Sequence, residues 1–487
     1  MSSLTGQYFD VIVIGSGISG LSSAVSANSA GARVLVLERA QEAEFGGNTR
    51  WTESYFRMKN ENEVSDDFEE LLVSNAGHHI DPNVVRHMSA SYETWPSYVK
   101  SHGMPDPELV STLSSQAGPT VNWLKSFGIC FDALPTYFVT AAAPRIMPVG
   151  GGLAMIEALR DHAVKQGVIF MYETTALQFT RDDGSGRLGV LVSDCTGKTL
   201  NLHAKAVIIA SGGFEGNPEM MTQYLGSTAK FVRPVARGGY YNKGEGIRMA
   251  LAAGAAPAGD FNSYHAEPLD PRSPQPEALV MNFSYGILVN RHGKRFCDEA
   301  PGPVDVHYDH ISRDISGQPD GIAYVIYDQK IDDVPNWKRS IRTDQPPMKA
   351  DSIEQLAREC GIPPAALART VTEFNKACPV GAFNPLKVDN LATEGIEPQK
   401  SNWSRPIENG PFFAYPIMSG VCFTYGGVKT NCNAQVMDSD GKPIPGLYAV
   451  GEAAGLYYQV YTGATSVLRG AVFGKIAGAH AAGLGSL

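Results

Sequence analysis

Apolar positions near the start of the chain follow one another in two uninterrupted runs rather than in alternation with polar ones. Residues 11–14 read Val-Ile-Val-Ile, and residues 33–37 end in Val-Leu-Val-Leu. Such runs are typical of parallel strands covered on both faces, because a half-exposed strand would alternate apolar and polar side chains. The segment between them predicts a glycine turn and a helix. The pattern therefore predicts a strand, turn, helix and strand of an α/β fold.

The turn after the first run has the spacing of a dinucleotide-binding site. Gly15 and Gly17 would let bare backbone approach a pyrophosphate, and Gly20 would let the helix pack closely on the strand. The N-terminus of that helix would stabilise the phosphate charge. Glu38 follows the glycines by about 20 residues, where a carboxylate can accept both hydroxyls of an adenosine ribose. We expect further contacts from the neighbouring residues Ser16, Ile18, Ser19 and Arg39.

Additional glycine turns favour FAD over NAD as the dinucleotide. The Gly-Gly-Asn-Thr turn at 46–49 directly follows the second strand and would surround a flavin and its phosphates with backbone amides. Residues 206–214 and 446–455 are each another buried strand that ends in a glycine turn. The residues of these turns that we expect to contact the cofactor are Gly46, Gly47, Asn48, Thr49, Ser211, Gly212, Gly451 and Glu452.

Composition and charge favour a soluble enzyme. The 487 residues include 40 Lys and Arg against 50 Asp and Glu, a formal charge of −10, which argues against a nucleic-acid or anionic-membrane surface. The seven cysteines are scattered and form no C-x-x-C pair, so we expect no disulfide framework and no metal site. The sequence shows no secretory signal and no apolar stretch of about 18 residues. We expect a cytoplasmic protein without a transmembrane segment.

Taken together, these segments resemble the fumarate reductase and succinate dehydrogenase flavoprotein superfamily, which also holds the 3-ketosteroid dehydrogenases. The resemblance extends through residues 244–255, 286–296 and 473–482. The GGNTR turn and residues 457–474 are most similar to the tricarballylate dehydrogenase group. The resemblance implies an α/β fold, with a discontinuous Rossmann-like FAD-binding domain at 1–260 and 410–487. An inserted α+β capping domain would occupy 261–409.

The resemblance also implies the roles of further cofactor residues. Glu452 matches the superfamily's contact to the ribityl chain, and Thr175 and Ala176 match its adenine-side strand. Relatives with covalent FAD carry a histidine near the second glycine cluster, and residues 48–51 here contain none, so we expect non-covalent FAD. The start of the last helix, which would face the pyrimidine carbonyl of the flavin, is Ser466, Val467 and Leu468.

The substrate site is where the chain departs from its relatives. Fumarate reductases have a histidine where this chain has Phe423, and their substrate-binding arginine falls on Tyr461. His265 matches a substrate-binding histidine of the family, and Arg313 matches its proton-shuttling arginine. These remaining positions still suit a carboxylic acid as the small-molecule substrate. Further candidates for substrate binding are Arg145, Thr424, Gly463 and Arg469.

Each catalytic candidate has an ordinary structural alternative. His265 would then be a hydrogen-bonded residue without a role in the reaction. Arg313 would form a surface ion pair with Asp309 or Asp314. Tyr461 would pack in the aromatic run that precedes it.

The expected reaction is the formation or reduction of a carbon–carbon double bond next to a carboxylate or carbonyl. One C–H would pass as hydride to flavin N5, and a base would remove the neighbouring proton. Arg313 or Tyr461 would carry that proton, although an arginine stays protonated up to about pH 12. A ketosteroid-type 1,2-dehydrogenase is the alternative enzyme, and a flavin-fold scaffold without cofactor is the non-enzyme alternative. The sequence leaves the electron acceptor or donor open.

Overall fold

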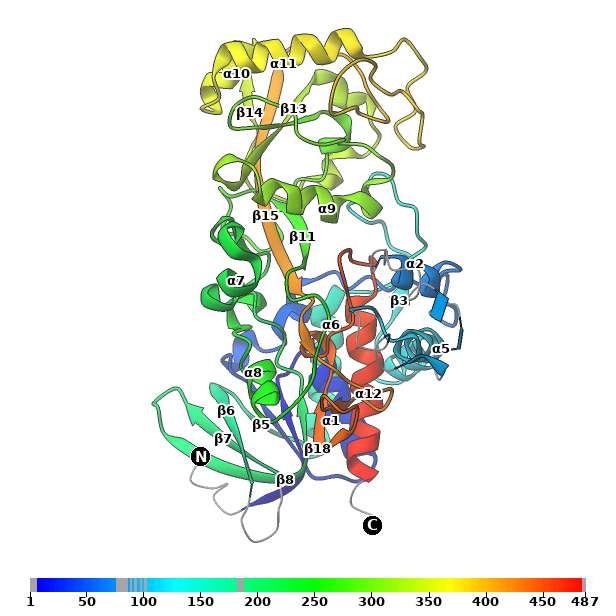
Figure 1. The fold of residues 1–487 in the computed structure, drawn as a ribbon, viewed down its shortest axis with the longest axis vertical. Coiled ribbons are helices and arrows are strands. Elements are labelled where there is room, and N and C mark those ends of the chain that lie inside the picture. The colour runs from blue at the N-terminus through cyan, green and yellow to red at the C-terminus, as the bar shows by residue number, and fades with distance from the viewer. Residues whose placement is uncertain are drawn as a thin grey trace.

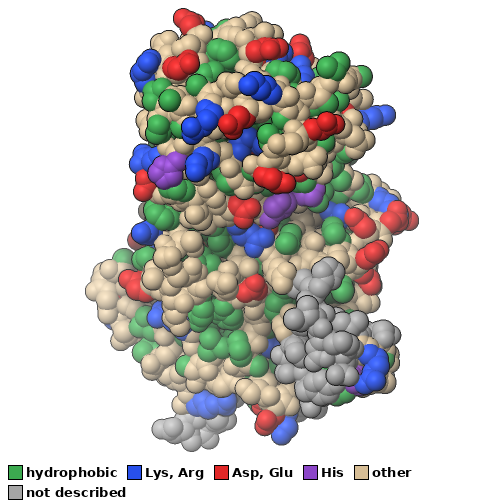
Figure 2. Space-filling view, turned by 45° about the horizontal axis from the view of Figure 1, so that its top comes forward, with side chains coloured by type: hydrophobic (Ala, Val, Ile, Leu, Met, Phe, Trp, Pro, Cys, Tyr) green, Lys and Arg blue, Asp and Glu red, His purple; other side chains and the backbone are tan. Residues whose placement is uncertain are grey.

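The computed structural model describes residues 7–75, 86–87, 90–91, 94–96, 99, 103–181 and 188–483. The molecule is elongated and consists of two lobes, with the long strand β15 (Phe412–Thr424) running from the upper lobe to the centre (Figure 1). In the space-filling view, charged and histidine side chains gather along the boundary between the lobes (Figure 2). The described helices include none that is long and apolar enough to cross a bilayer.

The lower lobe contains a sheet built around the first apolar run of the sequence. Strand β1 (Tyr8–Ile14) lies between β2 (Val34–Leu37) and β8 (Thr199–Ile209) and is parallel to both. Val11–Ile14 of β1 and all four residues of β2 are buried, which explains the two continuous apolar runs. The sheet is completed by β5 (Ile169–Met171), β6 (Thr174–Arg181), β7 (Leu188–Asp194), β17 (Gln435–Met437) and β18 (Pro443–Ala449).

Two helices far apart in sequence pack side by side in this lobe. They are α1 (Ile18–Ser29), directly after the glycine turn, and α12 (Ser466–Gly483), near the end of the chain (Figure 1). A Cβ on Gly474 would lie 2.4 Å from the backbone oxygen of Ser19, so only glycine permits this approach. Other helices of the chain's first half and its centre are α2 (Phe68–Ser74), α5 (Pro107–Lys125), α6 (Gly151–Lys165), α7 (Pro218–Leu225) and α8 (Glu245–Ala252).

The upper lobe is organised around β15. This strand pairs antiparallel with β11 (Tyr264–Leu269) and β13 (Ile322–Asp328). Helices α10 (Ile353–Glu359) and α11 (Pro364–Ala377) cover the top of the lobe, and α9 (Val304–Ser316) crosses its base (Figure 1). The sheet of β15 also contains β9 (Val232–Pro234), β12 (Ile287–Asn290) and β14 (Met348–Ala350). Two separate two-stranded sheets pair β3 (Phe131–Asp132) with β4 (Met147–Pro148) and β10 (Pro257–Ala258) with β16 (Gly427–Val428).

The upper sheet takes strands from beyond the expected cap. Both β9 and β15 lie outside residues 261–409, yet β15 pairs with β9 and also with β11 and β13 of that interval. The cap and the rest of the chain therefore share one sheet. The boundaries 1–260, 261–409 and 410–487 stay a prediction.

Candidate functional site

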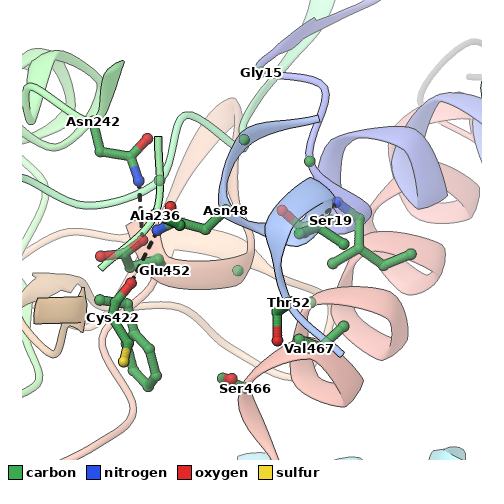
Figure 3. A pocket seen from close by; sticks show the side chains of 18 of the residues that line it. Gly15, Ser19, Asn48, Thr52, Ala236, Asn242, Cys422, Glu452, Ser466 and Val467 are labelled. Atoms are coloured by element: carbon green, nitrogen blue, oxygen red, sulfur yellow. Dashed lines mark hydrogen bonds between the residues drawn. The ribbon is translucent and has the colours of Figure 1, made fainter. Parts of the chain in front are cut away.

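One long cavity joins the two lobes. It runs from the turn after β1, past the start of α12, to the ends of β11 and β15. Figure 3 shows that its wall combines segments distant in sequence: Gly15 and Ser19, Asn48 and Thr52, Asn242, and Ser466 with Val467. We call the part beside the glycine turns the cofactor half. The part lined by His265 and its neighbours on β11 and α9 is the substrate half.

The glycine turn is closed too tightly for any side chain. Gly15 has φ of +107°, and a Cβ on it would lie 2.3 Å from the backbone oxygen of Ala210. A Cβ on Gly20 would lie 2.0 Å from the oxygen of Gly15. Gly17 caps α1 without a side-chain hydrogen bond. The first turn of α1 therefore presents bare backbone to the cavity, as phosphate binding requires.

Glu38 both lines the cavity and stabilises the turn. Its buried carboxylate accepts hydrogen bonds from the backbone N–H and the hydroxyl of Ser16, and from the N–H of Ala40 at 2.8 Å. Its neighbour Arg39 forms an ion pair with Glu245 and donates to the backbone oxygen of Tyr241. Other expected cofactor residues that line this half are Ile18, Ser19, Thr175, Ala176, Ser211, Gly212 and Gly451.

The second glycine turn folds back onto the first. Gly46 has φ of +107° and donates its N–H to the hydroxyl of Ser16 at 3.2 Å. The hydroxyl of Thr49 accepts the N–H of Ile18. Asn48 donates to the backbone oxygen of Cys422 at 3.0 Å, which links this turn to the end of β15 (Figure 3).

A pair of buried carboxyls lies behind Asn48, and the sequence pointed to only one of them. Glu215 accepts hydrogen bonds from Asn48 at 2.8 Å and Asn242 at 2.7 Å. Glu452 accepts the N–H of Thr424 at 2.7 Å and also its hydroxyl. Burial raises the pKa of both carboxyls, and their proximity raises the pKa of Glu215 further. The signal that could have revealed Glu215 is its position directly after the third glycine turn.

These features fit FAD. A side chain at Gly15, Gly20 or Gly46 would collide with neighbouring protein atoms, so these turns can only be built with glycine. The buried hydroxyl of Ser211 and the amide oxygen of Asn48 have no hydrogen-bond partner among the described residues, so they are available to a ligand. Ser466 and Val467 place the start of α12 beside the same space (Figure 3). Three expected cofactor residues, Gly20, Gly46 and Leu468, support the wall without lining the cavity.

Aromatic rings form the wall of the substrate half. The ring centroid of Tyr461 lies 4.2 Å from that of His265 and 5.2 Å from that of Phe423. His265 and the Tyr308 hydroxyl share a hydrogen bond of 2.7 Å through Nε2. Burial, with Arg313 as a smaller cause, lowers the pKa of His265 to about 3. The imidazole is therefore neutral near pH 7.

The hydroxyl of Tyr461 lies at the N-terminus of α12. It accepts the backbone N–H groups of Thr465 and Ser466, both at 3.0 Å, and donates to the Ser466 hydroxyl at the same distance. The helix dipole adds positive potential at this point. Negative charge on this oxygen would thus be stabilised by fixed donors on one side while the ring faces the cavity.

The guanidinium groups of the three arginine candidates all contact groups of the protein itself. Arg145 lines the cavity, but it forms a buried ion pair with Asp305. Arg313 is not among the described residues that line the cavity; it pairs with Asp309 at 3.2 Å and donates to the backbone oxygen of Gln459. Arg469 lines the cavity and its guanidinium carbon lies 4.5 Å from the ring centroid of Tyr457.

Two of the expected substrate residues do not line the cavity. Thr424 donates a hydrogen bond to Glu452 and is not part of the cavity wall. Gly463 lies near Asp305, also outside the wall. Their roles stay predictions.

The far end of the substrate half is acidic, which no sequence pattern indicated. Glu53, Glu267 and Glu277 line it. Arg342 forms ion pairs with Glu53 and, at 3.0 Å, with Glu277. His265, Glu267 and Cys422 also bring possible metal-ligand atoms within 4.8 Å of one another. We assign no metal here, and the expected absence of a metal stays a prediction.

Comparison with known proteins places this geometry in context. Residues 10–468 match the model of the FAD binding domain family. A fumarate reductase (cytochrome) of Shewanella frigidimarina is 28% identical over 486 residues, which cover 97% of this chain and 77% of that protein. A vinyl phenol reductase of Lactiplantibacillus plantarum is 26% identical, covering 93% and 91%. The crystal structure of a 3-ketosteroid-Δ4-(5α)-dehydrogenase from Rhodococcus jostii RHA1 is 26% identical, with a TM-score of 0.67 and coverage of 98% and 97%.

Proposed function

We propose that this chain, which belongs to the FAD binding domain family and is an FAD-dependent oxidoreductase acting on carbon–carbon bonds, transfers the substrate proton through Tyr461. The family match confirms the expected flavoprotein superfamily, its α/β fold and the FAD cofactor. The bond acted on lies next to a carbonyl or a carboxylate of the substrate. The observation that carries this proposal is the Tyr461 hydroxyl, held by two backbone N–H groups beside the cavity.

The cofactor half would hold FAD without a covalent bond. The turn at Gly15 and the start of α1 would bind the pyrophosphate, and Glu38 would bind the ribose. Asn48 and the start of α12 would lie on the flavin side. When bound, FAD supplies the two-electron acceptor or donor of the reaction. Residues 48–51 offer no histidine for a covalent link.

Tyr461 is better placed than Arg313 to move a proton. A phenol loses its proton near about pH 10, whereas a guanidinium holds it beyond about pH 12. Arg313 also has its charge paired with Asp309 and lies outside the described cavity lining. Tyr461 faces the cavity, and its oxygen has fixed donors that would stabilise the phenolate while the proton is away. We therefore propose that Arg313 positions Asp309 rather than reacting.

The substrate half favours a molecule with one carbonyl or carboxylate over a dicarboxylate. Phe423 and Tyr461 replace two groups that bind carboxylates in fumarate reductases, and the charge of Arg145 is paired with Asp305. The neutral imidazole of His265 can still bond to a substrate oxygen through its second nitrogen. The aromatic wall, and the similarity to a ketosteroid dehydrogenase, keep a cyclic ketone as the second candidate substrate.

Several features of the protein's setting are also proposals. We propose that residues 261–409 cap the flavin, that the protein is cytoplasmic, and that its electrons pass to an acceptor or donor that approaches from solvent.

A substrate screen tests the proposal. Purified holoenzyme is mixed without oxygen with saturated monocarboxylates, dicarboxylates and cyclic ketones, and bleaching of the flavin absorbance is recorded. In a parallel series, photoreduced enzyme is mixed with the corresponding alkenes, and recovery of the absorbance is recorded. We expect monocarboxylates or cyclic ketones to react. Reaction with dicarboxylates alone would contradict the proposed substrate preference, and no reaction in either direction would contradict the proposed function.

A further inference from the structure

We propose that the acidic far end of the substrate half binds a protonated nitrogen of the substrate through Glu267 and Glu277. The inference deepens the proposed function and rests on it, because it assigns the group carried by the substrate at the end remote from the reacting bond. It predicts a substrate that is an amine or a protonated nitrogen heterocycle as well as a carbonyl or carboxylate compound.

The register of β11 directs its acid to the same space as its histidine. His265 and Glu267 are separated by one residue on β11, and the pairing of β11 with β15 shifts by one residue between His265 and Ala266. Both line the cavity, and His265 is paired across the strands with Phe423. Glu267 thus lies two positions along β11 from His265, whose ring contacts that of Tyr461. A substrate held at those rings would extend towards this carboxyl.

Glu277 reaches the same end of the cavity from the loop that follows β11. Its side chain is 12% exposed, and φ of Glu277 is +52°, a left-handed conformation that non-glycine residues rarely adopt. Its N–H donates to the backbone oxygen of Val235 at 3.1 Å. The backbone is therefore held in an uncommon conformation that places a carboxyl beside the cavity.

Carboxyl groups outnumber cations at this end of the cavity. Glu53, Glu267 and Glu277 face the space, and the one cation beside them in the described residues is Arg342, which pairs with Glu53 and Glu277. Arg145 is neutralised by its own partner, Asp305. Glu267 has no ion-pair partner among the residues that the structure describes; the hydroxyl of Tyr137 donates to it at 3.1 Å.

Burial with few cations nearby favours the protonated forms of Glu267 and Glu277. It raises the pKa of Glu267, and it raises the pKa of Glu277 to about 8, with Glu267 as the next cause. The neighbouring Cys422 and Tyr308 stay neutral because burial raises the pKa of each. His265 adds no positive charge because burial lowers its pKa. A protonated nitrogen would supply the missing charge, and the carboxyls would then release protons as it binds.

Three matched probes test the proposal. They are trans-4-(aminomethyl)cyclohexanecarboxylate, 4-methylcyclohexanecarboxylate and trans-1,4-cyclohexanedicarboxylate, which share a ring and a carboxylate and differ in the second substituent. Binding to oxidised holoenzyme is followed by the perturbation of the flavin spectrum, and by calorimetry in two buffers of different ionisation enthalpy. We expect the amine to bind at least about tenfold more tightly than the methyl compound, with release of protons at pH 7.5.

Variants locate the effect. Glu267→Gln keeps the shape of the side chain and should remove most of the preference for the amine, as should Glu277→Gln. Glu394→Gln, at an exposed acid away from the cavity, is the matched control and should keep the preference. FAD content and thermal unfolding of each variant report whether it folds.

The outcomes separate this inference from the proposed function. Binding is measured without turnover, so a preference for the amine supports the inference even if no compound reduces the flavin. An amine that binds no more tightly than the methyl compound, including the case in which no probe binds, would overturn the inference. A preference that persists in both glutamine variants would overturn it as well.

Discussion

The two halves of the cavity are built in different ways. In the cofactor half, backbone groups from short contiguous turns form the wall, and glycines such as Gly15 and Gly20 leave no room for side chains. In the substrate half, side chains form the wall, and they come from β11, α9, the end of β15 and the segment before α12. A substitution in a backbone turn disrupts the turn itself. A substitution in a wall of side chains changes one contact and leaves the backbone in place.

This difference explains how a chain can keep its cofactor and change its substrate. By resemblance, Phe423 and Tyr461 match positions at which fumarate reductases carry a histidine and an arginine, and here both pack into one ring cluster with His265. The acidic far end gives the substrate half a second distinct surface. The comparison predicts that substitutions of the turn glycines in the cofactor half abolish FAD binding. Substitutions in the substrate half should change rate or selectivity and leave FAD in place.

The largest effect is expected for Gly20→Val. The added side chain would meet the oxygen of Gly15, 2.0 Å from the new Cβ, and would push α1 off the strand. We expect FAD content to fall by at least about tenfold, with lower thermal stability. The measurement is the ratio of flavin to protein absorbance after purification. Gly317→Ala is the control, because its Cβ would lie 3.6 Å from the nearest atom, and it should keep its FAD.

A more selective effect, confined to the reaction and sparing FAD, is expected for His265→Ala. The change removes a neutral imidazole that contacts Tyr461 and Tyr308, so the rate of flavin reduction should fall by about 10²-fold while FAD content holds. Single-turnover stopped-flow with a substrate from the screen measures the rate. Loss of FAD together with activity would show that the two halves are not independent.

Comparison of Arg313→Ala with His265→Ala tests whether Arg313 positions Asp309 or carries the proton. If Arg313 only positions Asp309, the substitution should lower stability more than rate, because it leaves a buried carboxyl unpaired; burial already raises the pKa of Asp309 to about 6. A loss of rate as large as that of His265→Ala, at unchanged stability, would instead assign the proton to Arg313.

Glu277→Gln should change the pH dependence of stability. The pKa of Glu277 in the folded protein is about 8, against an ordinary value of 4.5, so the folded state binds the extra proton and loses stability as pH rises between these values. The glutamine variant lacks this loss. Relative to the wild type it should gain on the order of 1–3 kcal/mol between pH 6 and pH 9. Urea unfolding at several pH values measures the gain. The same dependence of the unfolding free energy on pH in both proteins would contradict the raised pKa of Glu277.

The smallest effect is expected for Arg39→Ala. Arg39 lines the cofactor half, but its half-exposed guanidinium pairs with Glu245. Partly exposed ion pairs contribute little, so FAD affinity should fall by less than about tenfold. Titration of apoenzyme with FAD provides the measurement. A loss as large as that of Gly20→Val would mean that side chains, and not backbone, dominate this half.

Sequence reasoning was strongest where function depends on local backbone. The turn at Gly15 and the acid Glu38 could be predicted because their spacing alone defines the cradle. Glu267 and Tyr308 could not be predicted, since their approach to His265 depends on the register of β11 with β15 and on the packing of α9. Arg145 was expected to clamp a carboxylate, and only the fold reveals that Asp305 pairs with it. The roles of the catalytic candidates stay predictions.

The most direct test of the account is the rate of flavin reduction in Tyr461→Phe, measured by stopped-flow at saturating substrate across the pH range. The variant keeps the ring that contacts His265 and Phe423 but loses the hydroxyl held at the start of α12. We predict a rate about 10²-fold below that of the wild type, with FAD content and substrate affinity unchanged. A rate equal to that of the wild type at every pH would contradict the catalytic role of Tyr461.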